Sequence, residues 1–111
     1  MRTKLCHLPA ITLCALALAG CASFVPPPVT PAMVSASRGA SAATLESGRA
    51  LFAGRCTSCH SADPVEKYSL PRWREILADM AHRSKIDTAQ QSAILTYIAA
   101  AQAMPPDPSA R

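Results

Sequence analysis

The sequence has little of what usually builds a large core or crosses a membrane. Only five of its 111 residues are aromatic, and no segment alternates apolar and polar residues as a half-buried strand does. The longest apolar run, Leu5 to Leu18, has 14 residues, fewer than the ~20 that span a bilayer as a helix. No basic run is interleaved with aromatic residues, so the net charge of +4 does not indicate nucleic-acid binding.

The N-terminal segment has the organisation of a secretory signal. Basic residues precede the apolar run, and small residues follow it before Cys21. The sequence Leu18-Ala19-Gly20-Cys21 resembles the lipobox of bacterial lipoproteins, in which the cysteine is lipidated and becomes the first mature residue. We therefore expect a lipoprotein signal peptide over residues 1–20 and a lipid anchor on Cys21. An ordinary cleavage site and an uncleaved anchor are the alternatives.

The rest of the chain divides into a tether, one domain and a tail. Residues 21–43 are rich in proline, alanine and serine without an apolar period, which predicts a disordered tether. Its 22 residues after Cys21 would typically reach about 30 Å and at most ~70 Å. Residues 105–111 contain three prolines and are expected to be a disordered tail. The folded domain is therefore expected over residues 44–104.

Three helical patterns and no strand pattern occupy this domain, which predicts an all-α fold of three short helices. The first pattern begins at Thr44, a plausible N-cap. The second opens at Pro71, because proline suits the first turn of a helix. The third begins at Asp87, which with Gln90 forms a capping-box pattern. The apolar positions at helical spacing are Leu45, Gly48, Leu51 and Phe52; Trp73, Ile76, Leu77 and Met80; and Ile94, Tyr97, Ile98 and Ala101.

The sequence Cys56-Thr-Ser-Cys59-His60 is the pattern typical of covalent haem c attachment. Two thiols at this spacing reach the two vinyl groups of a porphyrin, and His60 then lies where its imidazole meets the iron. A domain with so few large side chains usually needs disulfides, a metal or a prosthetic group. A thioredoxin-like redox pair, half of a zinc site and a structural disulfide are the alternatives.

The haem motif belongs to a longer pattern, Gly48-x-x-Leu51-Phe52-x-x-x-Cys56-x-x-Cys59-His60, which with Tyr97-Ile98 resembles class I-like bacterial cytochromes c. The resemblance covers about residues 45–103. It implies that the first and last helices cross at the glycine, so that Gly48 and Phe52 contact Tyr97. The expectation is thus a short cytochrome c-like domain with one haem.

The chain departs from many of these cytochromes in length. Only 26 residues separate His60 from Asp87, so the loop that presents a methionine in longer relatives is missing or replaced. The run from Trp73 to Met80, followed by Arg83, resembles the short haem domains of dihaem cytochromes and quinohaemoprotein subunits. In those domains a methionine on a helix ligates the iron.

Three side chains compete as the iron ligand opposite His60. Met80 shares the apolar stripe of its helix, whereas His82 lies about 200° away around the helix axis. We therefore expect Met80 to be the ligand, with His82, Met104 and an open sixth site as alternatives. Trp73 is expected to bind the cofactor through a haem propionate or to be a core residue.

These expectations describe an electron carrier and not an enzyme. One covalent haem c would exchange single electrons with a redox donor and acceptor, and a lipid anchor would hold the chain at the periplasmic face of the outer or inner membrane. Ala22 after the cysteine favours the outer membrane by resemblance. A haem-bearing accessory subunit of a dehydrogenase and a haem gas sensor with an open sixth site are the alternative functions.

Overall fold

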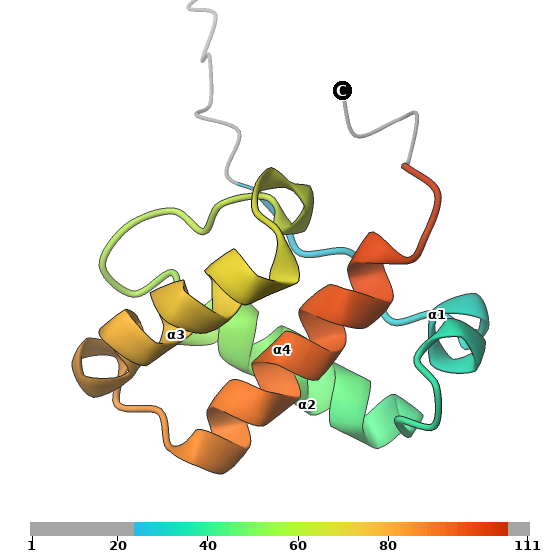
Figure 1. Ribbon diagram of the computed structural model, residues 1–111, viewed down its shortest axis with the longest axis horizontal. Helices are drawn as coiled ribbons and strands as arrows, with labels where there is room; N and C mark the ends of the chain where they lie inside the picture. The colour runs from blue at the N-terminus through green and yellow to red at the C-terminus, as the bar shows by residue number, and fades with distance from the viewer. Residues whose placement is uncertain (1–23, 107–111) are drawn as a thin grey trace, which may run out of the picture.

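The computed structural model describes residues 24–106, which form an all-α fold without strands in that range (Figure 1). The predicted signal peptide, Cys21 and most of the predicted tail lie outside these residues. Within residues 24–106, no helix has the length and apolarity needed to cross a membrane. The elements are α1 (Pro31–Ala36), α2 (Ala42–Gly54), the 3-10 turn η1 (Val65–Lys67), α3 (Leu70–Ser84) and α4 (Thr88–Gln102).

The helix starts follow from capping side chains. The capping box at Asp87 and Gln90 is confirmed, because each side chain bonds the backbone N–H of the other residue. Helix α3 is capped by Ser69, and Pro71 lies in its first turn. Helix α2 begins earlier than expected, because Ser41 and not Thr44 is its N-cap. The Ser41 hydroxyl accepts the Thr44 N–H, which satisfies a donor left free in the first turn.

Helices α2 and α4 cross in direct contact, with α4 in front of α2 in Figure 1. A Cβ on Gly48 would lie 2.2 Å from the Ala93 carbonyl oxygen and 2.8 Å from Tyr97 Cβ, so only glycine fits at this crossing. The Phe52 and Tyr97 rings lie 6.3 Å apart between their centroids. The expected contact of Gly48 and Phe52 with Tyr97 is therefore confirmed.

Helix α3 packs on α4 but not closely on α2, and aromatic side chains fill the space between α2 and α3. The Trp73 ring meets Phe52 edge-to-face at 5.6 Å and Tyr68 at 5.3 Å. At the far end of α4, the Gln102 amide donates to the carbonyls of Val65 and Tyr68, at 2.6 and 2.8 Å. These bonds fix η1 against α4.

The described part of the expected tether is folded onto the domain, which corrects the prediction of a disordered segment over residues 21–43. Residues 24–37, here called the N-terminal strap, include α1. Met33 is only 2% exposed and belongs to the hydrophobic core. The Phe24 ring packs edge-to-face on Phe52 at 6.4 Å. The domain therefore starts well before residue 44, because the strap supplies apolar side chains that the three predicted helices lack.

Candidate functional site

The cysteine pair lies on an irregular loop between α2 and η1, residues 55–64. Residues 56–63 make no backbone–backbone hydrogen bond to any described residue. Side chains shape the loop instead: Thr57 donates to the Ala53 carbonyl, and Ser58 donates to the Arg55 carbonyl at 2.8 Å. Within the loop, Ala62 and Cys56 contact the hydrophobic core, so the loop is held by side chains and not by a backbone hydrogen-bond ladder.

One apolar cavity joins most of the side chains singled out in the sequence. Cys56 and His60 reach it from the loop, and Trp73 and Met80 reach it from α3. Cys59 is exposed and does not line it. The remaining walls are Phe52, Ala62, Asp63, Ile76 and Leu77. The structure thus brings a thiol, an imidazole and a thioether to one site between α2 and α3.

The three candidates for the ligand opposite His60 occupy different places. Met80 is half-buried at the cavity, with Trp73 and Leu77 of the same stripe buried beside it. His82 is exposed on α3 and does not line the cavity. Met104 packs against the core beyond the end of α4, also away from the cavity. Of these three residues, only Met80 lines the same cavity as His60.

The two thiols differ in their surroundings. Neither is in a disulfide. Burial raises the pKa of Cys56 from 9.0 to about 11, because a thiolate is poorly solvated away from water. Cys56 is therefore a poor nucleophile at neutral pH, unlike the acidic cysteine of a thioredoxin-like pair. The described residues also lack the strands of a thioredoxin fold.

The Trp73 side chain has one hydrogen-bond donor, the indole N–H, and its partner lies inside the protein. Its indole N–H donates to the Val65 carbonyl at 2.9 Å, and the residue is buried. This contact favours the core interpretation of Trp73 over the propionate interpretation, although Trp73 also lines the cavity. The bond also links the cavity wall to η1.

Asp63 lines the cavity but was not singled out from the sequence. Lys67 donates to one carboxylate oxygen at 2.6 Å, and the Tyr68 hydroxyl donates to the other at 3.1 Å. The bond from Lys67 chiefly lowers the pKa of Asp63. The sequence signal for this ion pair is the spacing of Asp63 and Lys67, which are four residues apart and follow shortly after His60. The carboxylate therefore links the C-terminal end of the loop to η1.

The donor set suits a haem better than a lone metal ion. Among residues 24–106, no group of three or more His, Cys, Asp or Glu side chains gathers as a metal site. A histidine and a methionine that line one apolar cavity, beside a thiol pair, match the ligands and attachment points of haem c. The cavity measures about 40 Å³, against ~300 Å³ or more for common ligand pockets. Residues 55–64 would therefore have to move away from α3 to admit a porphyrin.

Comparisons with protein-family models, with curated proteins and with solved structures find no match to this chain.

Proposed function

We propose that this chain is a monohaem c-type cytochrome that transfers single electrons. Cys56 and Cys59 hold the haem through thioether bonds, His60 is one axial ligand of the iron, and Met80 is the other. The observation that carries the proposal is that Cys56, His60 and Met80 line one cavity, although the last two are 20 positions apart in sequence.

Each residue has a defined part in this proposal. The iron of the bound haem supplies the one-electron step between its ferrous and ferric states. Each Cys S–H would add across a vinyl C=C bond of the haem. The resulting thioether bonds would retain the haem even in a small domain. The Met80 thioether favours ferrous iron and so raises the reduction potential relative to a second histidine. The aromatic and aliphatic walls formed by Phe52, Trp73 and Leu77 exclude water from the site.

The helix crossing supports the same proposal independently of the cysteines. The resemblance to class I-like cytochromes c implies that the first and last helices meet at a glycine with an aromatic contact. Gly48, Phe52 and Tyr97 make this contact. The all-α fold and the haem motif therefore agree with each other, although they rest on different residues.

The cellular setting of the proposal comes from the sequence. Lipidation of Cys21 would hold the protein on the periplasmic face of the outer or inner membrane. Its partners would be a redox donor and a redox acceptor. The chain itself would be an electron carrier and not an enzyme.

Ligand variants of the full-length protein test the axial assignment. The oxidised protein should show the weak far-red absorption band of thioether ligation. Met80→Ala should abolish this band and open the reduced iron to carbon monoxide, whereas the matched variant His82→Ala should change neither property. A band lost in His82→Ala and kept in Met80→Ala would contradict the assignment. Carbon monoxide binding by the unaltered reduced protein would instead favour the gas sensor.

A further inference from the structure

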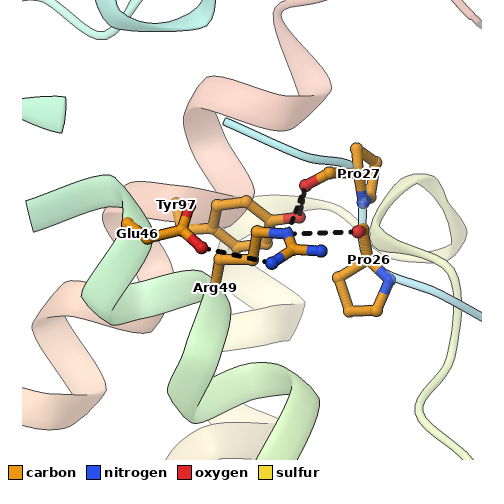
Figure 2. Close-up of polar contacts among 5 residues, drawn as sticks. All are labelled: Pro26, Pro27, Glu46, Arg49 and Tyr97. Atoms are coloured by element: carbon orange, nitrogen blue, oxygen red, sulfur yellow. Dashed lines mark hydrogen bonds and ion pairs between the residues drawn. The ribbon is translucent and has the colours of Figure 1, made fainter. Parts of the chain in front are cut away.

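The N-terminal strap is held to the domain by hydrogen bonds to its proline carbonyls. The Tyr97 hydroxyl donates to the Pro27 carbonyl at 2.7 Å, and Arg49 Nε donates to the same oxygen at 3.0 Å (Figure 2). Arg49 Nε also lies 3.3 Å from the Pro26 carbonyl oxygen. A polyproline segment forms no hydrogen bonds within itself. Its carbonyls are therefore free to accept from donors on α2 and α4.

The two donors are themselves positioned by the domain. Glu46, one turn before Arg49 on α2, accepts from the Arg49 guanidinium at 3.2 Å and orients it (Figure 2). Tyr97 is fully buried, and burial raises its pKa above the ordinary value, so the hydroxyl keeps its proton. The strap also buries Met33 and packs Phe24 on Phe52. Polar and apolar contacts thus fix the strap from both ends.

The docked strap leaves a very short connection to the proposed anchor. Only Ala22 and Ser23 separate Cys21 from Phe24, a reach of about 10 Å. A free tether over residues 22–43 would reach about 30 Å. The start of the strap also lies beside the cysteine loop. Phe24, Val25 and Pro26 share a hollow of about 380 Å³ with Thr57 and Ser61 of that loop.

This end of the strap has a surface suited to lipid. Residues 24–37 contain no charged side chain, so their approach to a membrane costs no desolvation of charge. Val25 is 72% exposed and is the one exposed large hydrophobic side chain among the described residues. We propose that the docked strap holds the domain against the membrane surface, with the cysteine-bearing loop on the lipid side. This inference rests on the lipid anchor of the proposed function.

Hydrogen exchange tests whether the strap is docked, and it needs no haem. We would compare the full-length protein with the release variant Arg49→Met/Tyr97→Phe, which removes both donors to Pro27. The matched control, Arg74→Met, removes an exposed guanidinium on α3, away from the strap. The α1 amides should exchange roughly tenfold faster in the release variant and unchanged in the control, as expected for the loss of about two hydrogen bonds. Equal exchange in all three proteins would overturn docking. Met33→Ser provides a second release variant that leaves the helix crossing intact.

Energy transfer tests which side of the domain faces the lipid. The lipidated protein would be inserted into phosphatidylcholine vesicles that carry a headgroup fluorophore, and haem would act as the quencher. Quenching should be several-fold stronger for the unaltered protein than for either release variant. If hydrogen exchange shows that the strap is docked but quenching is no stronger than in the release variants, the loop faces away from the membrane. That result would overturn the proposal. Absence of haem absorbance would overturn the proposed function instead, and hydrogen exchange would still decide docking.

Discussion

Gly48 is the position where one added methyl group should damage the fold most. In Gly48→Ala the new Cβ would lie 2.2 Å from the Ala93 carbonyl oxygen and 2.8 Å from its carbon. Both atoms belong to the α4 backbone and have no rotamer to which they can move. The added methyl group must therefore push α2 and α4 apart at their crossing.

The cost follows from two opposing effects. Overpacking a core costs about 1–3 kcal/mol, and the upper end applies where the neighbour is backbone. Alanine is better than glycine in a helix by about 0.5–1 kcal/mol. The net loss in the free energy of unfolding is therefore about 2 kcal/mol, which lowers Tm by roughly 8–16 °C in a domain of this size.

Thermal unfolding followed by circular dichroism measures this change, and Gly54→Ala is the matched control. Gly54 lies in the same helix, but a Cβ there would meet no atom within 4 Å. This control should be neutral or more stable by ~0.5 kcal/mol or less, because only the helix preference changes. If Gly48→Ala unfolds at the same temperature as Gly54→Ala, the close crossing of α2 and α4 is not real.

Three further predictions concern α4, the cavity wall and the thiols. Asp87→Ala removes the α4 N-cap and should lower the free energy of unfolding, measured by urea titration, by about 1 kcal/mol. An unchanged free energy would refute the capping role of Asp87. Trp73→Phe removes a buried donor and part of a ring at the cavity, and should cost about 1–3 kcal/mol; an unchanged midpoint would contradict this packing. In haem-free protein at pH 8, iodoacetamide should alkylate exposed Cys59 before Cys56. The Cys56 rate should climb only as the pH approaches about 11, because burial keeps that thiol protonated. Faster reaction at Cys56 than at Cys59 would contradict this difference in exposure.

Much of the helical core was predictable from local sequence signals. The capping box at Asp87 and the apolar stripe from Ile94 to Ala101 are short-range patterns, and both are present in α4. The glycine at the crossing was predicted through the resemblance, because no local pattern shows which helix approaches Gly48. The start of α2 was misplaced, since both Ser41 and Thr44 are good caps and the local sequence does not choose between them.

The sequence signals located part of the cavity lining but not its full geometry. The spacing of Cys56, Cys59 and His60 is local, and helical periodicity places Met80 on the inner face of α3. The sequence could not show that Asp63 joins the cavity wall or that the Trp73 donor goes to Val65. Both contacts depend on the path of an irregular loop, which has no period to read.

The strap was missed for a different physical reason. Its prolines and small residues predict a flexible segment, because they carry no helical or strand period. What holds it is a donor 70 residues away, the Tyr97 hydroxyl, together with Arg49 on α2. Only a three-dimensional arrangement brings these donors to one carbonyl. The Thr30 N-cap and Pro31 mark the start of α1 locally, but only the surface on which the strap lies shows that it is docked.

The most direct test of the haem assignment is the mass and absorption of one tryptic peptide from protein made in cells that attach haem c. Cleavage after Arg55 and Lys67 releases residues 56–67, which contain both thiols and His60. The account predicts that this peptide carries the mass of one haem, absorbs visible light and has no thiol free to alkylate. A colourless peptide with two reactive thiols would contradict it.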